Sequence, residues 1–300
     1  MSELPIDFIH CGTVSEFIKS IPDESVDLVL TDPPYGMNYK SREKHIKHAT
    51  IENDNMNDYF RCLLTDYYKE CGRILKVGGA IYSFCSHHHI EFFKKQICDN
   101  FTYKKILTWY KNNHTAGDHK TNYAPIQEFI IYATKGEHIL RGGFDRDVLA
   151  FSKVSRKERK KLNHATPKPI DLLSYLIRKS TDPDDIVFDG FLGSGQTAKA
   201  AWLTGRRYVA AELDSDHWMT SMCSVSEAAD EEIEALMNET GLTWEQLQDM
   251  PEGDNFEVVS IQEVDPMTIP ESERDRYFAT KKTRIKKQCP CPCHRKRRKT

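Results

Sequence analysis

The segment between Ile186 and Leu213 constrains the fold more than any other part of the chain. Ile186–Asp189 is a short apolar run typical of a buried strand, and Tyr208–Leu213 is a second one. Between them lie a glycine-rich turn, Phe191–Gly195, and a helical pattern, Gln196–Thr204. A strand, a helix and a second strand in succession form the repeating unit of parallel sheets. The segment therefore predicts an α/β fold.

The same alternation of strands and helices runs through the rest of the chain. Further strands are expected at 26–31, 80–85, 104–110 and 128–133, and further helices at 58–75, 88–98 and 168–180. Gly78 and Gly79 indicate a turn after the first of these helices. The pattern as a whole predicts a mostly parallel sheet with helices on both faces.

Three polar segments interrupt the alternation, at residues 36–57, 111–124 and 136–166. The first holds four lysines and arginines, and the third contains the basic run Ser155–Lys161. Basic loops at one edge of a sheet suit a polyanionic partner. A solvated surface loop is the alternative, and each segment taken singly fits it equally well.

The net charge of −3 hides two oppositely charged segments near the C-terminus. Residues 227–273 hold fifteen Asp and Glu without a Lys or Arg, and residues 281–300 hold ten Lys and Arg without an acid. We expect one folded domain over 1–225, an acidic extension over 226–280 and a disordered basic tail over 281–300. The acidic extension is either a solvated, partly helical or disordered segment or a partner site that mimics DNA.

The basic tail suits contact with nucleic-acid phosphates, although a plain disordered tail or one folded back on the acidic extension fits too. It also contains Cys289, Cys291, Cys293 and His294, which are residue types that bind zinc. Structural zinc sites separate their ligand pairs by a loop, whereas these four lie within six residues. The sequence therefore predicts no resident metal, either there or at His87–His89. A metal site shared with another segment, or adventitious metal binding, is the alternative for the tail.

Several classes of protein do not fit this chain. No apolar run approaches the roughly 20 residues of a membrane-spanning helix. The first ten residues have neither the basic start nor the apolar core of a secretory signal. The nine cysteines follow no paired spacing, which is typical of reduced thiols. We expect a cytoplasmic protein that does not bind membranes.

The glycine-rich turn has the chemistry of a cofactor site. Gly193 and Gly195 let a ligand approach the backbone, and the start of the next helix presents N–H groups to it. Glu212 closes the next strand, where a carboxylate can accept hydrogen bonds from ribose hydroxyls. Taken alone, these residues also fit a dinucleotide fingerprint that ends at Ala198. Tight packing between helix and strand explains the glycines without any ligand.

The segment Thr31–Gly36, of sequence TDPPYG, lies at the end of the predicted strand 26–31, and strand ends are where α/β proteins bind ligands. Its prolines fix the backbone and remove two N–H donors, so the Pro33 carbonyl and the ionised Asp32 form a pair of acceptors beside the ring of Tyr35. A planar heteroaromatic amine matches this pair, because it offers two N–H donors and a ring that stacks. A proline-rich turn capped by an aspartate is the structural alternative.

Four motifs together resemble those of the amino-group DNA methyltransferases. Asp32–Tyr35 is similar to their catalytic D-P-P-Y motif, and Phe191–Gly195 to the F-x-G-x-G motif that binds S-adenosylmethionine. His164–Pro169 resembles the H-P-T-Q-K-P box, and Glu212–Asp214 resembles the acidic motif at the following strand end. The catalytic motif comes first in the chain, which is similar to the circularly permuted order of the β-group.

The resemblance covers residues 7–220 and implies a Rossmann-like methyltransferase fold with S-adenosylmethionine as cofactor. It implies double-stranded DNA as the partner, a DNA-recognition insertion at about residues 111–163, and a DNA-associated protein of a prokaryotic or phage-infected cell. A homodimer and a cognate restriction endonuclease are expected partners of such an enzyme. Ala165, Pro167 and Gly190 depart from the family pattern, which more often has Pro, Gln and Pro at these positions.

The resemblance also assigns roles to individual residues. The catalytic residues are Asp32, Pro33, Pro34 and Tyr35. The cofactor-binding residues are Asp189, Phe191, Gly193, Gly195, Glu212, Thr166, Lys168 and Asp32. Asp189 and the glycine-rich turn are expected to hold the methionine part of the cofactor, and Glu212 its ribose. Thr166 and Lys168 are expected to close over it from the other side, a surface lysine being the alternative for Lys168.

The resulting hypothesis is methyl transfer to N6 of an adenine flipped out of the duplex. Hydrogen bonds from the amine to Asp32 and to the Pro33 carbonyl would localise a nitrogen lone pair that is otherwise delocalised into the ring. Cytosine N4 is a similar amine, but the family's cytosine enzymes more often carry Ser at position 32. RNA or protein-amide methyltransferases more often carry Asn there, and a catalytically inactive DNA-binding protein is a further alternative. Lys111 and Asn112 fit either contact to DNA or an ordinary loop.

Overall fold

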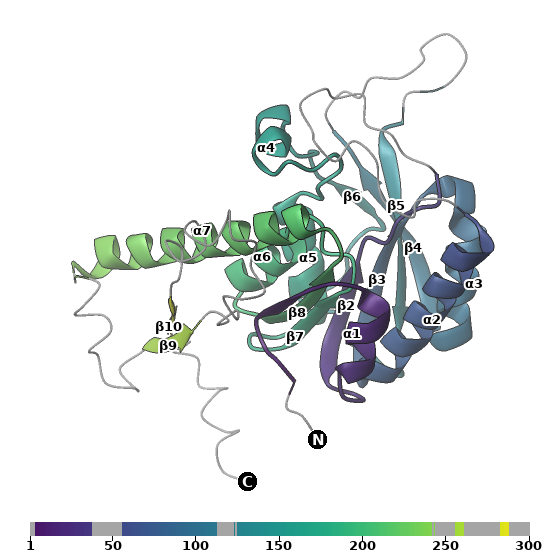
Figure 1. The fold of residues 1–300 in the computed structure, drawn as a ribbon, viewed down its shortest axis with the longest axis horizontal. Helices are drawn as coiled ribbons and strands as arrows, with labels where there is room; N and C mark the ends of the chain where they lie inside the picture. Colours follow the sequence, from purple (N-terminus) through teal and green to yellow (C-terminus); the bar gives the residue numbers. More distant parts are fainter. Residues whose placement is uncertain are drawn as a thin grey trace. The chain divides into compact units, whose positions relative to one another are not determined.

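Figure 1 shows a computed structural model of the chain, which describes residues 4–37, 56–112, 123, 125–241, 243, 256–260 and 283–287. The chain divides into two compact units, Met1–Ser224 and Val225–Thr300. All four motifs singled out in the sequence fall within the first unit. The expected domain bounds of 1–225, 226–280 and 281–300 stay predictions.

The first unit is built around an eight-stranded sheet with the strand order β1-β8-β7-β2-β3-β5-β4-β6. The strands are β1 Phe8–Cys11, β2 Val26–Thr31, β3 Leu75–Cys85, β4 Thr102–Tyr110, β5 Gln127–Thr134, β6 Val148–Ala150, β7 Ile186–Asp189 and β8 Arg207–Glu212. The neighbours from β1 to β3 run parallel, β5 is antiparallel to both of its neighbours, and β6 runs parallel to β4. The predicted α/β class with a mostly parallel sheet is confirmed.

Helices cover both faces of this sheet (Figure 1). They are α1 Val14–Ser20, α2 Asp58–Ile74, α3 Ile90–Asn100, α5 Ile170–Ser180 and α6 Gln196–Leu203. Side chains of α1, α2 and α3 share one buried cluster with Ile81 of β3 and Phe188 of β7. Tyr82 follows Ile81 and points to the opposite face, where its hydroxyl lies 2.8 Å from the Ser180 hydroxyl of α5.

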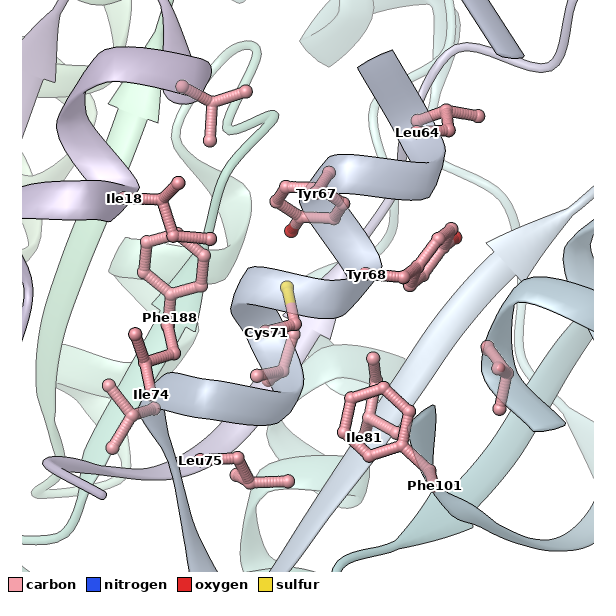
Figure 2. Close-up of a cluster of buried hydrophobic side chains, with 14 of the residues drawn as sticks. Ile18, Leu64, Tyr67, Tyr68, Cys71, Ile74, Leu75, Ile81, Phe101 and Phe188 are labelled. Carbon is pink, nitrogen blue, oxygen red and sulfur yellow. The ribbon is translucent and has the colours of Figure 1, made fainter. Parts of the chain in front are cut away.

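Helix α2 illustrates how the sequence builds the first face. The Asn57 side chain caps it by accepting the N–H of Phe60 at 2.8 Å. Its buried residues recur every three or four positions and are Phe60, Leu64, Tyr67, Tyr68, Cys71 and Ile74. Figure 2 shows Leu64, Tyr67, Tyr68, Cys71 and Ile74 in one cluster with Ile18 of α1 and Ile81 of β3. The helical pattern predicted for 58–75 is therefore the core-facing stripe of α2.

Strand β3 is longer than the sequence predicts, and the predicted turn at Gly78 and Gly79 is wrong. The strand begins at Leu75 and continues through both glycines. The N–H of Gly78 donates to the Lys135 carbonyl at 2.7 Å, with φ at +90°. A Cβ on Gly79 would lie 2.9 Å from the carbonyl oxygen of Asp27. The glycines thus permit close approach of neighbouring backbone within the sheet rather than a change of direction.

The polar segment predicted as a loop at 136–166 contains strand β6 and a short helix, α4 Arg156–Lys161. The Ser155 hydroxyl caps α4 by accepting the N–H of Glu158 at 3.2 Å. The basic run is therefore largely helical, which corrects the loop prediction. Most of the other two polar segments lies outside the described residues, namely 38–55, 113–122 and 124.

After β8, helix α7 runs from Ser215 to Thr240 and includes the beginning of the predicted acidic extension. Strands β9 Phe256–Ser260 and β10 Thr283–Lys287 form an antiparallel pair. The cysteines and histidine of the tail, at 289–294, lie outside the described residues. None of the helices in the described part of the chain combines the length and apolar character needed to cross a membrane.

Candidate active site

The two principal motifs are distant in the sequence and adjacent in the sheet. Strands β2 and β7 are hydrogen-bonded neighbours, with Val29 opposite Phe188. Because the strands are parallel, both end at the same edge, where Asp32 follows β2 and Asp189 ends β7. Strand β8 pairs with β7 on its other side and ends at Glu212. The carboxyl ends of three adjacent strands therefore bring three carboxylates to one edge of the sheet.

Asp32 is bound on both of its oxygens. Its Oδ1 accepts the hydroxyl of Tyr35 at 2.6 Å, and its Oδ2 accepts the Nζ of Lys168 at 2.5 Å. The Asp32 side chain is 24% exposed, whereas that of Lys168 is only 7% exposed. Burial raises the pKa of the Asp32 carboxyl, and the Lys168 ammonium offsets part of this shift. The carboxylate predicted to bind the target amine thus forms an ion pair with a lysine of the protein itself.

Lys168 belongs to a row of four alternating charges, Asp32, Lys168, Glu128 and Lys111, which we call the charge row. The Nζ of Lys168 lies 3.3 Å from Oε2 of Glu128, and Oε1 of Glu128 accepts the Nζ of Lys111 at 2.5 Å. Burial by itself raises the pKa of Glu128, but the two lysines outweigh it and lower the pKa. Burial lowers the pKa of Lys168, while the two carboxylates outweigh it and raise the pKa. Glu128 and Lys168 therefore stay charged near neutral pH.

Strand pairing brings Lys111 and Glu128 together. Strands β4 and β5 are antiparallel with Trp109 opposite Glu128, and Lys111 directly follows β4. Sequence analysis missed Glu128 as a site residue. The available signal was a charged residue at the head of the otherwise apolar run 129–133. Asn112, which follows Lys111, accepts the hydroxyl of Ser152 at 2.6 Å.

The Tyr35 ring is packed from two directions. Its edge meets the ring of Phe93, with 6.4 Å between centroids. The Lys168 ammonium lies 5.5 Å from the centroid of the Tyr35 ring and 5.0 Å from that of Phe84. These are distances at which a cation is attracted by an aromatic face. The ring predicted to stack on a base therefore already contacts Lys168.

The glycine-rich turn is fixed by its neighbours. The N–H of Gly193 donates to Oε2 of Glu212 at 2.6 Å, with φ at +57°. Gly195 has φ at +87°, and a Cβ there would lie 2.6 Å from the Cα of Ser221 in α7. At Gly195 the structure favours the packing explanation of the glycine, because backbone atoms fill the space that a side chain would need.

The segment His164–Pro169 links the turn to Asp32. A Cβ on Gly193 would lie 2.9 Å from the Nε2 of His164, so the imidazole covers this glycine. The N–H of Thr166 faces the Nδ1 of His164 at 3.3 Å, and two residues later Lys168 reaches Asp32. The box thus contacts both motifs. The Lys168 ammonium contacts the Asp32 carboxylate. The resemblance implied that Lys168 closes over the cofactor, and that role stays a prediction.

Asp189 and Glu212 are buried without a cation. Asp189 accepts the N–H of Phe191 at 3.0 Å, and Glu212 accepts the N–H of Asp214 at 2.9 Å in addition to that of Gly193. No lysine or arginine among the described residues forms an ion pair with either carboxylate. Burial raises the pKa of Asp189 to about 6 and that of Glu212 to about 7. A cationic ligand would stabilise the ionised form of both.

A further acceptor directly follows the glycine-rich turn in the sequence. Gln196 opens helix α6 directly after the turn and is 4% exposed. Its Oε1 is buried and accepts no hydrogen bond from the described residues. A buried carbonyl oxygen without a donor is costly unless a ligand supplies one. The acceptors of this region therefore fit a ligand that combines positive charge with N–H groups.

The histidine run at 87–89 forms a short 3-10 turn, η1, between β3 and α3. The rings of His87 and His88 lie 3.9 Å apart between centroids. Within the described residues, no three His, Cys, Asp or Glu side chains gather in a way that could hold a metal ion.

The chain matches a family model described as DNA methylase over residues 26–222. It is 29% identical over 249 residues to the type II methyltransferase M.HinfI of Haemophilus influenzae, covering 72% of this chain and 68% of that protein. It is 29% identical over 242 residues to the DNA adenine methyltransferase YhdJ of Escherichia coli K12, covering 70% and 79%.

Solved structures share the fold at lower identity. The M1.HpyAVI complex with SAM superposes with a TM-score of 0.57 at 23% identity, covering 72% of this chain and 98% of that one. The cytosine-N4-specific PvuII DNA methyltransferase gives a TM-score of 0.59 at 18% identity, covering 77% and 90%. The chain thus shares its fold with a cytosine-N4-specific DNA methyltransferase.

Proposed function

This chain belongs to the DNA methylase family, and on that premise we propose that it methylates the N6 amine of adenine in double-stranded DNA, with S-adenosylmethionine as methyl donor. The observation that carries the proposal is the adjacency of Asp32 and Asp189 at the ends of two neighbouring parallel strands. Asp32 is the acceptor for an amine, and Asp189 precedes the glycine-rich turn that suits the cofactor. Of two relatives with similar coverage, one is named a type II methyltransferase and the other a DNA adenine methyltransferase.

The residues of the turn fit the cofactor, which when bound supplies an electrophilic methyl group on a positively charged sulfur. Asp189 and Glu212 offer buried carboxylates to its cationic and hydroxyl groups, and the Gln196 carbonyl offers an acceptor to its ammonium group. Phe191, Gly193, Gly195 and Thr166 shape the surroundings. Holding the reacting partners in line supplies much of the rate in a transfer of this kind.

Asp32 acts on the amine. Its carboxylate accepts one N–H of the exocyclic amine, the Pro33 carbonyl accepts the other, and the nitrogen lone pair becomes available for attack. The nitrogen that gains a methyl group carries one proton too many, and Asp32 is the acceptor at hand for it. Pro34 helps to fix this backbone, because its ring restricts φ and removes a donor.

The target base must leave the duplex to reach a carboxylate at a strand end. Unstacking costs a few kcal/mol. Stacking on the Tyr35 ring recovers about 1–3 kcal/mol of it. Tyr35 also donates its hydroxyl to Asp32 at 2.6 Å, which holds the carboxylate in one orientation.

Cytosine N4 is the competing target, because the shared fold includes a cytosine-N4-specific enzyme. The aspartate at position 32 and the relative named as an adenine methyltransferase both favour adenine. Incubation with tritiated cofactor and unmodified duplex, followed by hydrolysis and separation of the bases, decides between them. Label in cytosine would overturn the choice of adenine while leaving DNA methylation intact.

The role of Asp32 is tested by Asp32→Asn, which keeps the shape and removes the charge. We expect methylation to fall by a factor on the order of 100 or more. Asp99→Asn removes a carboxylate that is exposed and paired with Lys95, and it should leave the rate unchanged. A thermal unfolding curve checks that both variants fold. Methylation by Asp32→Asn at the parental rate would refute the proposed mechanism.

The wider setting is part of the same proposal. The M.HinfI relative is named a type II methyltransferase, which favours a restriction-modification context. A cognate endonuclease would then be blocked by DNA that this enzyme has modified, and sequencing modified bases in expressing cells identifies the protected site. Homodimerisation stays a prediction, which sedimentation of the purified chain tests.

A further inference from the structure

The Lys168 ammonium contacts both groups to which the target base would bind, the Asp32 carboxylate and the Tyr35 ring. It lies 2.5 Å from Oδ2 of Asp32, where the amine would donate, and 5.5 Å from the centroid of the Tyr35 ring, where the base would stack. One cation thus occupies both the hydrogen-bonding position and the stacking position of the proposed base-binding site. The target amine must therefore compete with Lys168 for Oδ2 of Asp32.

A second carboxylate lies beside the same ammonium. Oε2 of Glu128 is 3.3 Å from the Nζ of Lys168, close enough for an ion pair. The same oxygen is buried and makes no well-directed hydrogen bond in the described part of the chain. Glu128 therefore holds an acceptor that is near Lys168 and still incompletely used.

Glu128 is also held in place independently of Lys168. Its other oxygen, Oε1, accepts the Nζ of Lys111 at 2.5 Å, and the Lys111 side chain is 15% exposed. The N–H of Lys111 donates to the Ile126 carbonyl at 2.7 Å, two residues before Glu128 in the chain. The second carboxylate is therefore anchored to the paired strands β4 and β5 and can keep its position while Lys168 moves.

We propose that Glu128 is a positioning residue for methyl transfer, which receives the Lys168 ammonium when the target amine replaces it on Asp32. The inference rests on the proposed role of Asp32. No covalent bond changes in this exchange, because Lys168 keeps its proton and the incoming amine is neutral. The ammonium trades one carboxylate for another, and the amine takes over the vacated acceptor.

The arrangement explains why two carboxylates flank one buried lysine. A buried charge that loses its partner is strongly destabilising. If Asp32 were the only carboxylate near Lys168, a neutral amine could displace the lysine only by leaving its buried charge unpaired. With Glu128 at 3.3 Å, the lysine remains paired throughout, so a neutral amine can compete for Asp32.

The test begins with Glu128→Gln, which removes the receiving charge. We expect the single-turnover rate at saturating DNA to fall about tenfold, with little change in the KM for DNA. Glu91→Gln changes an exposed glutamate at the start of α3 and serves as the matched control. A parental rate for Glu128→Gln would overturn the proposal.

The double variant Glu128→Gln/Lys168→Met separates positioning from a purely structural role. If Lys168 is trapped on Asp32 in the single variant, removing the lysine should raise the rate at least about threefold above that of Glu128→Gln. A double variant as slow as the single one, or slower, would show that Glu128 only supports the structure, and the proposal would fail.

Two further variants keep the result interpretable. Glu128→Asp retains the charge but places it farther from Lys168, so its rate should fall less than that of Glu128→Gln. This variant replaces Glu128→Gln in the test if the latter does not fold. A parental rate for Glu128→Asp in that case would overturn the proposal. Asp32→Asn is measured alongside, because its retained activity would refute the role of Asp32 itself, whereas its loss combined with a parental Glu128 variant would refute only the positioning role.

Discussion

The two sides of the candidate site neutralise their buried carboxylates in different ways. After β2, Asp32 is bound by the ammonium of Lys168. After β7 and β8, Asp189 and Glu212 are bound by backbone N–H groups and keep raised pKa values of about 6 and about 7. Asp32 is paired with a cation of the protein, which the target amine must displace. Asp189 and Glu212 have no such partner among the described residues and suit a cation that a ligand brings.

Backbone contacts fix the glycine-rich turn after β7. Gly195→Ala tests their importance and has the largest expected effect. The added Cβ would meet the Ser221 backbone at 2.6 Å in a conformation with φ at +87°. We expect the free energy of unfolding to fall by about 3 kcal/mol or more. Chemical denaturation of the purified variant measures it.

Gly205→Ala is the matched control for this change. Gly205 has a similar φ of +78°, but nothing lies within 4 Å of the Cβ that alanine would add. Only the conformational strain applies, so the expected loss is about 1–2 kcal/mol. Equal losses for the two variants would show that contact with Ser221 has no role in fixing the turn.

The second prediction concerns the raised pKa of Glu212. An ionised carboxylate attracts a cationic cofactor, so the affinity for S-adenosylmethionine should increase by about tenfold as the pH rises through 7. Calorimetry at a series of pH values measures the effect. Glu212→Gln should flatten the dependence near pH 7, leaving only a weaker rise near pH 6 from Asp189. A pH-independent affinity in the parent enzyme would show that Glu212 does not attract the cofactor through its charge.

The same pKa affects the stability of the free enzyme with the opposite sign. Folded Glu212 keeps its proton up to about pH 7, whereas the unfolded side chain releases it near the ordinary value of 4.5. The folded state therefore binds more protons in this window, and its free energy of unfolding should decrease as the pH rises from 4.5 to 7. Denaturation of the parent and Glu212→Gln at both ends of the window measures the contribution.

The smallest expected effect comes from Tyr35→Phe on the β2 side. The variant keeps the ring for stacking and loses the hydroxyl that donates to Asp32 at 2.6 Å. One hydrogen bond of about 1 kcal/mol corresponds to a loss of roughly fivefold in rate. Tyr35→Leu, which also loses the ring, should be slower still. A Phe variant as slow as the Leu variant would assign the role of Tyr35 to its hydroxyl.

Local patterns in the sequence predicted the elements that carry the site with good accuracy. Strands 26–31 and Ile186–Asp189 match β2 and β7, because short apolar runs at the centre of a parallel sheet are buried on both faces. Gly78 and Gly79 were misassigned, since a glycine pair predicts a turn by local preference alone. The neighbouring Lys135 and Asp27 backbones instead incorporate the pair into β3.

Two local segments encode the chemistry that the chain can offer, namely Asp32 with its two prolines and Tyr35, and a glycine-rich turn after a strand. These features are encoded by neighbouring residues, and their spacing is visible without a structure. The family match over residues 26–222 agrees with them.

By contrast, the folding of the sheet is what places Lys168 on Asp32 and lets Glu128 and Lys111 complete the charge row. Lys168 is 136 residues from Asp32, and Lys111 meets Glu128 through the pairing of β4 and β5. Contacts of this kind depend on which strands become neighbours, because buried charges take whichever partners the sheet brings within reach.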